Sequence, residues 1–479
     1  MFDPHLSDDD QPRDHSPVRL SFEQGTLTLC GVSNDLIKKV FEPAQWVFDV
    51  RSQSYRTDAY QYREVVDRMK NRIAGTFQDE VPDWKPISIR QPNLHHLRAD
   101  QTEAVDAWMK TRRGVVVMPT GTGKTEVALQ IICRLGCSVL VVAPVRDLMY
   151  QWHERIIKAT GIDAGIIGDG VHRVSPISVT TYDSASIHMA RIGNRFELII
   201  FDECHHLPSP MRQDAALMCA APYRLGLTAT PQRGRGKVEN NDAYDEFLGP
   251  RVYTQAIEAA RGKTLAAYDV IRIAVHLSDE ERSRYTRLGK IVAKYISDRR
   301  ADTPDYDWKA LCRDSGHSPE ARRALVAFHA KRSIEDRAAD KLRIIEDLFR
   351  LHAGEPVIVF CGSNAMARDV SLRFLIPCLL SHCRKRERQE ILSGLREGRY
   401  PAIVANRVLD EGVDLPEVNV AIVVGGGAGT RQALQRLGRV LRKNQFGGAV
   451  FYEIVTAGTR DELRSRSRRS SDAFRVKSC

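Results

Sequence analysis

The sequence of 479 residues lacks the features that mark membrane-spanning, zinc-ribbon and secreted proteins. No stretch approaches the ~18 consecutive apolar residues that a membrane-spanning helix requires. The ten cysteines are scattered, and none forms a CxxC pair typical of a zinc ribbon or a thioredoxin-type site. Residues 1–17 contain Asp8–Asp10 and no apolar core, so we interpret them as a disordered polar tail rather than a signal peptide. We therefore expect a cytoplasmic protein with reduced thiols.

Composition and charge narrow the class further. Apolar residues make up 43% and charged residues 28%, as in an ordinary globular protein, and the length suggests about three domains. Basic residues outnumber acidic ones by 71 to 61, for a net charge of +10. This excess favours a polyanionic partner, either nucleic acid or a membrane surface, over a mildly basic protein with no such partner.

Two blocks of the sequence alternate short apolar runs with longer helical segments, which is typical of parallel α/β sheets. In the first block we predict strands at Val115–Met118, Val139–Ala143, Ile177–Val179, Leu198–Phe201 and Leu225–Leu227. In the second we predict strands at Val357–Phe360, Ala402–Val404, Val420–Val424 and Ala449–Ile454. The fold class is therefore α/β, with two similar parallel-sheet domains.

The remaining segments frame these two blocks. We predict a small N-terminal α/β domain (18–80) with a hairpin around Gly25 and a helix near Tyr62–Met69, and then a Pro-rich linker (81–96). The first large domain spans 97–278, a helical basic insert 279–336, the second large domain 337–458 and a flexible basic tail 459–479. In the insert, apolar residues recur at helical spacing, and the arginines and lysines between them could equally form a solvated face.

The strongest chemical signal is the loop that follows the first predicted strand. Glycines allow its backbone N–H groups to point at phosphate oxygens, and the start of the next helix adds positive potential. Lys124 is expected to reach the β- and γ-phosphates of ATP, and the Thr125 hydroxyl to ligate Mg²⁺. The P-loop pattern has glycine where this sequence has Met118. The expected phosphate-binding residues are Thr120, Gly121, Thr122, Gly123, Lys124 and Thr125.

A second signal lies at the end of the apolar strand Leu198–Phe201, where Asp202 and Glu203 follow. Parallel α/β sheets bind ligands at the carboxyl edge of their strands. Asp202 is expected to hold Mg²⁺ and Glu203 to orient and deprotonate the attacking water. The neighbouring Cys204, His205 and His206 could suggest a metal site, but no matching ligand pair occurs elsewhere, so zinc is not expected.

A third signal is the segment containing Gln435, Arg439 and Arg442, late in the second block. Phosphoryl transfer builds negative charge on the γ-phosphate, and an inserted arginine can raise the rate by ~10³–10⁵. Arg439 and Arg442 share one face if the segment is helical. A solvated arginine-rich helix is the more common fate of such residues, but the spacing with Gln435 favours a catalytic role.

Together these motifs resemble the helicases and translocases of superfamily 2, in which ATP binds between two RecA-like domains. The resemblance implies adenine recognition by Arg98 and Gln101, and contacts of Gly412 and Asp414 with ATP. It implies coupling of hydrolysis to domain movement by Thr228 and Thr230, a role that we also expect of His205. It further implies contacts with a nucleic-acid backbone by Pro144, Arg146, Thr180 and Thr181.

The amino-acid sequences of three motifs are similar to those of the XPB branch of this superfamily: Phe201–Pro208, Tyr223–Thr230 and Val408–Pro416. The N-terminal segments Phe48–Arg51, Tyr55–Arg56 and Tyr62–Arg63 resemble the damage-recognition domain of microbial XPB proteins, and the basic insert stands where that branch carries its thumb. The resemblance implies an ATP- and Mg²⁺-dependent DNA helicase or duplex translocase with 3′-to-5′ polarity, acting in DNA repair. It also implies DNA rather than a membrane as partner, backbone contacts of low sequence specificity, association with the nucleoid and a nuclease partner.

One departure from the branch bears on strand separation. The branch carries an Arg-Glu-Asp element implicated in duplex separation, where this sequence has Arg233, Gly234 and Arg235. Only the first arginine is kept, and the charge at the last position is reversed. Two other functions remain open at this point: an RNA-directed or restriction-type ATPase of superfamily 2, and a DNA-binding clamp that ATP switches with little turnover.

Overall fold

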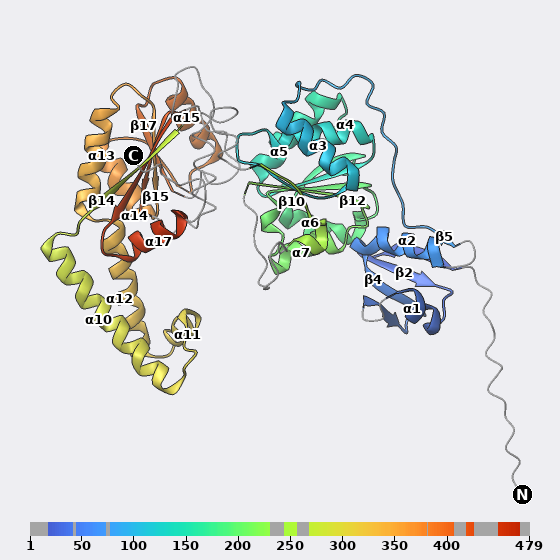
Figure 1. Cartoon of the computed structure of the whole chain (residues 1–479), viewed down its shortest axis with the longest axis horizontal. Helices are drawn as coiled ribbons and strands as arrows, with labels where there is room; N and C mark the ends of the chain where they lie inside the picture. The colour runs from blue at the N-terminus through green and yellow to red at the C-terminus, as the bar shows by residue number, and fades with distance from the viewer. Residues whose placement is uncertain are drawn as a thin grey trace, which may run out of the picture. The chain divides into compact units, whose positions relative to one another are not determined.

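The computed structural model describes residues 18–41, 45–72, 77–229, 244–255, 268–380, 382–406, 418–425 and 449–469 (Figure 1). The chain divides into two compact units: the first comprises the residues up to Met118 and Gly123–Thr254, and the second comprises Pro119–Thr122 and the residues from Gln255 onward. Among the described residues, no helix is both long enough and apolar enough to cross a membrane. Each unit is built around one or more sheets.

The first unit begins with a small sheet in the order β3-β4-β2-β1-β5. Its strands are β1 (Arg19–Glu23), β2 (Thr26–Cys30), β3 (Val47–Asp49), β4 (Ser54–Asp58) and β5 (Gln78–Asp79). The predicted hairpin is confirmed, because β1 and β2 pair antiparallel around a turn in which Gly25 has φ +85°. Helices α1 (Asn34–Val40) and α2 (Tyr62–Arg72) pack on this sheet through a core that includes Leu20, Leu29 and Met69.

A larger sheet follows, in the order β13-β6-β12-β11-β7-β10-β8-β9. Its strands are β6 (Arg113–Val117), β7 (Val139–Ala143), β8 (Gly165–Gly168), β9 (Val171–Arg173), β10 (Ile177–Thr181), β11 (Leu198–Asp202), β12 (Tyr223–Thr228) and β13 (Arg251–Thr254). All neighbours are parallel except β8 and β9. The five predicted strands are confirmed. Their apolar runs are buried on both faces, as parallel strands covered by helices require.

Helices cover both faces of this sheet (Figure 1). One face packs against α3 (Ala99–Thr111), α4 (Lys124–Leu135) and α5 (Arg146–Thr160), and the other against α6 (Tyr182–Ile192) and α7 (Pro210–Leu217). The loops before α4, α5 and α6 therefore all leave the carboxyl edge of the sheet. This arrangement brings the predicted phosphate-binding and acidic motifs to one edge.

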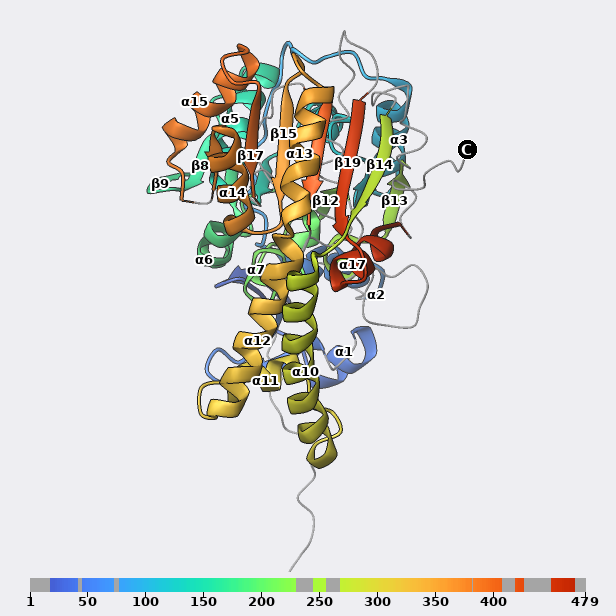
Figure 2. The same ribbon diagram turned by 90° about the vertical axis from the view of Figure 1, so that its left-hand side faces the viewer.

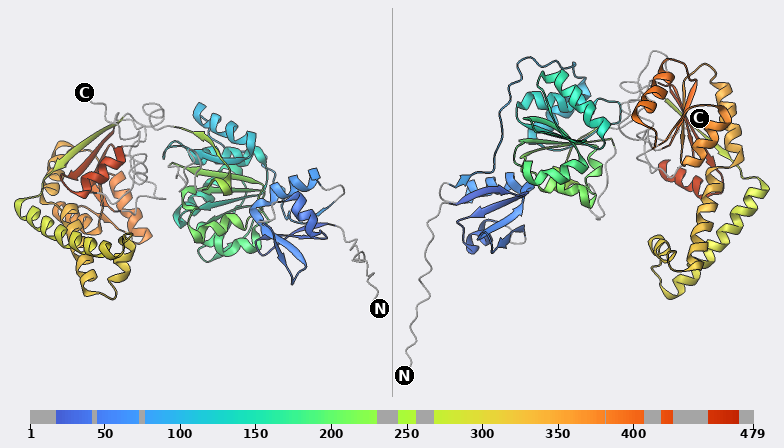
Figure 3. Two further views of the ribbon diagram at one scale, coloured as in Figure 1. Left: turned by 60° about the horizontal axis from the view of Figure 1, so that its bottom comes forward. Right: turned by 180° about the vertical axis from the view of Figure 1, so that it is seen from behind.

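The second unit holds a sheet with helices on both faces (Figure 3). Its strands are parallel and lie in the order β14-β19-β18-β15-β17-β16. Its strands are β14 (Tyr268–Val275), β15 (Val357–Cys361), β16 (Cys378–Leu379), β17 (Ala402–Ala405), β18 (Val420–Val424) and β19 (Ala449–Thr456). Helices α13 (Ala339–Leu351) and α14 (Asn364–Phe374) pack on one face, and α15 (Lys385–Arg396) packs on the other. Two parallel-sheet domains are thus confirmed.

The helical insert is a pair of long antiparallel helices, α10 (Asp279–Asp302) and α12 (Pro319–Asp336), with the short α11 (Trp308–Asp314) between them in sequence (Figure 2). Ser278 caps α10 by accepting from Glu281 N, and Ser318 caps α12 by accepting from Ala321 N. Helix α10 contains no buried residue. The insert is therefore a thin arm rather than a globular domain, and we call it the thumb.

Two predicted boundaries differ from the structure. The first large domain was predicted to reach residue 278, but β14 pairs along its whole length with β19 and so belongs to the second sheet. The tail 459–479 was predicted to be flexible, but residues 460–469 form α17 (Arg460–Arg469). Asp461 and Ser465 of α17 are fully buried, and Ser465 Oγ donates to Glu453 Oε2 at 2.7 Å. Both errors involve partners that lie far away in the sequence, β19 for β14 and Lys341 for Asp461 of α17.

Candidate active site

The loop between β6 and α4 has the geometry of a phosphate cradle. Gly121 and Gly123 have φ +85° and +83°, a left-handed conformation that favours glycine. The Thr122 hydroxyl donates to Pro119 O at 2.7 Å, which closes the loop from within. Helix α4 begins immediately afterwards at Lys124, so its free N–H groups and the loop face the same space.

The two residues predicted to recognise adenine lie beside this loop. Gln101 is buried, and its Oε1 accepts from the backbone N–H of Arg98 at 3.0 Å. A Cβ placed on Gly123 would lie 2.3 Å from Gln101 Nε2, so the amide packs directly against the loop. The Arg98 guanidinium forms an ion pair with Asp100 at 3.2 Å. Gln101 thus contributes to the shape of the loop, and Gly123 is required there both for its φ and for its missing side chain.

Lys124 is held at the centre of the site by a backbone carbonyl and a carboxylate. Its Nζ donates to Met118 O at 3.3 Å and lies 3.8 Å from Glu203 Oε1. Both side chains are almost buried, with 9% and 13% of their surface exposed. The predicted phosphate-binding lysine and the predicted catalytic base are therefore brought together across strands β6 and β11. The two opposite charges neutralise one another in this arrangement.

Asp202 is the buried carboxylate of the site. Its Oδ2 accepts from Trp152 Nε1 at 2.8 Å, and its Oδ1 accepts from Glu203 N at 3.0 Å. Burial, together with the neighbouring Glu203 carboxylate, raises the pKa of Asp202 to about 6. A bound cation would reverse this effect, because it stabilises the charged form of the carboxylate.

Glu203 is held in an unusual backbone conformation, with φ +48°. Its Oε2 lies 3.3 Å from His205 Nδ1, and the same nitrogen lies 3.1 Å from Thr228 Oγ1 at the end of β12. Burial by itself would raise the pKa of Glu203, but Lys124 and His205 outweigh it and lower the pKa to about 2. A chain of polar contacts therefore joins Lys124 to Thr228 through Glu203 and His205, and both residues predicted for coupling here lie on it.

The residues present fit Mg²⁺ bound together with nucleotide phosphates. Thr125 is the second residue of α4, and Asp202 ends a strand at the same edge. In the part of the chain that the structure describes, no three His, Cys, Asp or Glu side chains are grouped as a metal site. Mg²⁺ in nucleotide sites takes one or two protein oxygens and fills the remaining positions with water and phosphate. One carboxylate and one hydroxyl agree with that pattern.

The four residues predicted to contact nucleic acid differ in exposure. Arg146 begins α5 and is exposed, with an ion pair to Asp169 at 2.6 Å. Pro144 is buried, and Thr180 is buried with its hydroxyl donating to Ile167 O at 2.7 Å. Thr181 accepts from Ser184 N at 3.3 Å as the cap of α6. Direct contact by the Thr180 hydroxyl does not agree with this structure, because the hydroxyl is buried and already donates to a carbonyl of β8.

Two residues of the site were missed from the sequence. Trp152 Nε1 donates to the Asp202 carboxylate, and the Tyr182 hydroxyl donates to Asp202 O at 3.1 Å. Both side chains reach β11 from helices, α5 and α6, on opposite faces of the sheet. Their sequence signal was only that of an aromatic residue on an apolar helical face, which is most often a core position.

Several predicted residues lie outside the described residues. They are Gln435, Arg439, Arg442, Gly412, Asp414, Thr230 and the segment Arg233–Arg235. Their roles stay predictions.

Comparisons with known proteins agree with this geometry. Three family models match the chain: "Xeroderma pigmentosum group B helicase damage recognition domain" over residues 20–81, "Type III restriction enzyme, res subunit" over 94–233, and "Helicase conserved C-terminal domain" over 340–444. A solved structure, the helicase domain of Pyrococcus furiosus Hef, matches with a TM-score of 0.53 over 78% of this chain and 98% of that one. At 18% identity, this match shows the fold alone.

Two curated relatives carry more sequence similarity. The "DNA 3'-5' translocase XPB2" of Sulfurisphaera tokodaii is 41% identical over 418 residues, which cover 87% of this chain and 94% of the relative. The "DNA 3'-5' helicase XPB" of Kineococcus radiotolerans is 30% identical over 381 residues, covering 76% of this chain and 61% of that longer protein.

Proposed function

The chain belongs to the XPB family of superfamily 2 DNA helicases and translocases, and we propose that it uses ATP hydrolysis to move 3′ to 5′ along DNA. The observation that carries the proposal is the buried contact between Lys124 and Glu203, 3.8 Å apart, beside Asp202. A protein that only binds nucleotide has no need of a carboxylate placed to activate water. DNA repair is proposed as its setting.

We propose the following roles for the residues of the site. Backbone N–H groups from Gly121 to Thr125 hold the phosphates, and Lys124 exchanges Met118 O and Glu203 for phosphate oxygens. Glu203, once released from Lys124, orients the attacking water and accepts its proton. Thr125 and Asp202 would hold Mg²⁺, which supplies charge stabilisation at the phosphates when it is bound.

Coupling to movement is proposed to pass through His205. This side chain contacts Glu203 on one side and Thr228 on the other, at 3.3 and 3.1 Å. A change in the position of Glu203 on nucleotide binding or hydrolysis therefore alters the contact at the end of β12. Arg439 and Arg442 are proposed as the arginines that stabilise the transferred phosphoryl group.

The test is steady-state ATP hydrolysis with no polymer, single-stranded DNA, duplex DNA or RNA. Stimulation by DNA well above RNA is expected, with loss of activity in Lys124→Ala. Stimulation by RNA alone would favour the RNA-directed alternative. ATP-dependent DNA affinity without turnover would favour the clamp. Two assays would show whether the chain with Arg233–Arg235 still unwinds DNA. Displacement of a third strand from a triplex measures movement along a duplex, and separation of the duplex strands measures unwinding.

The restriction-type alternative draws on the family model for residues 94–233. That match covers one domain, whereas the Sulfurisphaera relative matches 87% of the chain, which favours the XPB function. A cytoplasmic, nucleoid-associated location and a nuclease partner are proposed from the family. The partner is tested by asking whether the chain changes the rate or position of DNA cleavage by a candidate nuclease.

A further inference from the structure

The thumb has two unlike faces, and one of them carries an excess of positive charge. A cavity of about 530 Å³ lies between α10, α12 and the start of α17. Of the residues that line it, one is acidic, Glu335, and five are basic: Arg300, Lys331, Arg332, Arg460 and Arg464. Because α17 had been predicted to be a flexible tail, this cavity was not foreseen from the sequence.

Acidic groups around the cavity are already engaged. Glu335 is buried and pairs with Arg464, and it also accepts from the Tyr285 hydroxyl at 3.2 Å. Asp336 lies 3.8 Å from Arg332. Arg300 donates to the carbonyl of Tyr306. Two cations, Lys331 and Arg460, are thereby left without an ion pair among the described residues.

Lys331 and Arg460 rest on aromatic rings instead. Lys331 Nζ lies 4.5 Å from the centre of the Tyr285 ring, and Arg460 Cζ lies 5.9 Å from that of Phe328. Gly289 leaves room for the ammonium group, since a Cβ there would lie 3.2 Å from Nζ. Burial and the charge of Arg460 lower the pKa of Lys331, with Glu335 acting in the opposite direction. The two cations therefore repel one another, and an anion between them would relieve that repulsion.

An aromatic surface adjoins the cations. The Trp308 ring lies 4.2 Å from the Phe328 ring and 6.2 Å from that of His329, measured between centres. Trp308 is 42% exposed although it is one of the largest apolar side chains. Three groups therefore follow one another in space along this face: the two cations, the Phe328 ring and the partly exposed indole of Trp308.

We propose that this face of the thumb binds an unpaired nucleic-acid strand, with bases stacked on Trp308 and phosphates held by Lys331 and Arg460. Proteins that bind single strands without sequence preference combine these two elements, cations for the backbone and aromatic rings for the bases. An acidic peptide would pair with the two cations but would offer no planar group to stack on the exposed indole of Trp308. The site shares no residue with the ATP-binding site, so the two can be tested separately.

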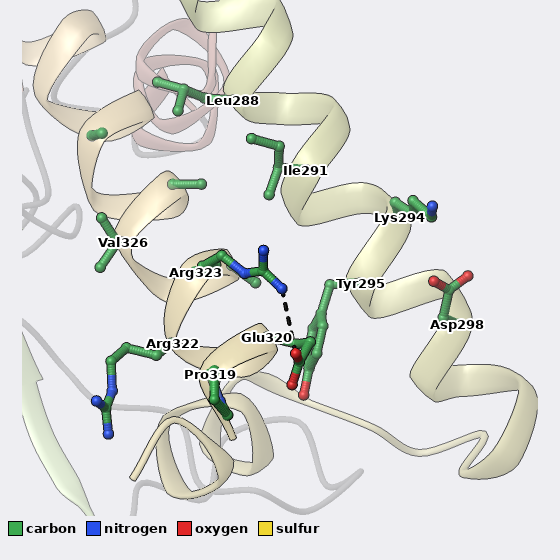
Figure 4. A pocket seen from close by; sticks show the side chains of 13 residues that line it. Leu288, Ile291, Lys294, Tyr295, Asp298, Pro319, Glu320, Arg322, Arg323 and Val326 are labelled. Carbon is green, nitrogen blue, oxygen red and sulfur yellow. Dashed lines mark hydrogen bonds and ion pairs between the residues drawn. The ribbon is translucent and has the colours of Figure 1, made fainter. Parts of the chain in front are cut away.

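The opposite face of the α10–α12 pair supplies a matched control (Figure 4). A groove there is lined mainly by apolar side chains such as Leu288, Ile291 and Val326. Of its three cations, Arg322, Arg323 and Lys294, the first two are engaged: Arg323 bonds to Glu320 at 3.3 Å, and Arg322 donates to the carbonyls of Ser315 and Gly316. Removal of charge at Arg323 therefore alters the same helix as removal at Lys331, but not the proposed site.

The experiment compares full-length variants for their affinity for a fluorescent oligo-dT. Trp308→Ala should weaken binding about tenfold, while Trp308→Phe, which keeps a stacking ring, should retain most of it. The double variant Lys331→Gln/Arg460→Gln should lower the salt dependence by about 1.4 log units per log unit of salt, the share of two phosphate contacts. Arg323→Gln should change neither. A photoreactive 5-iodouracil strand should cross-link to the peptide that contains Trp308.

Duplex-stimulated ATP hydrolysis and thermal melting are measured in parallel. A Trp308 or Lys331/Arg460 variant that hydrolyses ATP normally but binds oligo-dT more weakly supports the site. If the unmodified protein does not hydrolyse ATP, that result counts against the proposed motor function and not against the strand-binding site. Equal weakening by Trp308→Ala of oligo-dT and of an abasic strand would overturn the stacking. Competition by pyrophosphate as strong as that by oligo-dT, or cross-links that do not map to the thumb, would overturn the strand assignment.

Discussion

The buried ion pair at the base of the thumb offers a sharp test of the structure. Lys341 Nζ, on α13, donates to Asp461 Oδ2, on α17, at 2.8 Å, and both side chains are fully buried. Lys341 also donates to Glu335 O at the end of α12, and Asp461 accepts from Thr456 N at 3.1 Å. The pair thus joins the thumb, the last strand of the sheet and the C-terminal helix.

Replacing Lys341 by methionine keeps most of the side-chain volume and removes only the charge and its hydrogen bonds. Asp461 would then be left buried, with Thr456 N as donor and Arg464 at 4.0 Å as the nearest remaining cation. Breaking a buried pair by removing one partner costs about 3–5 kcal/mol. Because Arg464 partly compensates, we expect a loss near the lower end, about 3 kcal/mol in the free energy of unfolding of the second unit.

The assay is urea denaturation followed by far-ultraviolet circular dichroism. Arg343→Met is the matched control, since Arg343 is 72% exposed on the same helix and its pair with Asp340 spans 3.9 Å, so a loss of at most about 1 kcal/mol is expected. The double variant Lys341→Met/Asp461→Leu should recover much of the loss, because an apolar pair can replace a buried ion pair. A chain ending at residue 458 should be destabilised like Lys341→Met. If Lys341→Met and Arg343→Met are equally stable, the reasoning is refuted.

Four further predictions concern the ATP site. Glu203→Gln should retain ATP binding and lower hydrolysis about 10²–10⁴-fold, and equal turnover would remove Glu203 as the base. Trp152→Phe removes the indole N–H that donates to Asp202 Oδ2. It should lower the free energy of unfolding by about 1–3 kcal/mol, measured by thermal denaturation, and should also slow ATP hydrolysis. Gly123→Ala, whose Cβ meets Gln101, should raise KM for ATP, measured against Gly161→Ala, where no neighbour lies within 4 Å. Chelation of Mg²⁺ by EDTA should abolish hydrolysis and leave the melting temperature unchanged.

The strands and the ATP-binding motifs were predictable because their signals are local. An apolar run such as Val139–Ala143 is buried on both faces wherever it lies in a parallel sheet, and a glycine loop before a helix binds phosphate through its own backbone. The second sheet shows the limit of local signals. Strand β14 precedes the thumb in sequence, yet its partner β19 begins 181 residues further on at Ala449, and pairing across that distance leaves no mark on either segment.

The same limit explains the errors near the chain end and in the site. Helix α17 is rich in arginine and serine, and only its contacts with Lys341 and Glu453 show which two of its residues are buried. Trp152 and Tyr182 were missed for the converse reason. Each has the sequence signal of a core residue, and each is a core residue that also donates one hydrogen bond to Asp202. No pattern distinguishes such an indole or phenol from its neighbours before the sheet is assembled.

The contacts of Lys124 indicate how binding and catalysis are linked. In the structure this cation and Glu203 satisfy one another, so the carboxylate that we propose as the base is engaged by Lys124. Under the proposed mechanism, phosphate oxygens compete for Lys124 with more charge than Glu203 offers and so release the carboxylate. Glu203 also contacts His205, which lies against Thr228 on the neighbouring strand. The proposed exchange would therefore also change the contact at the end of β12, without a separate relay to report that ATP is bound.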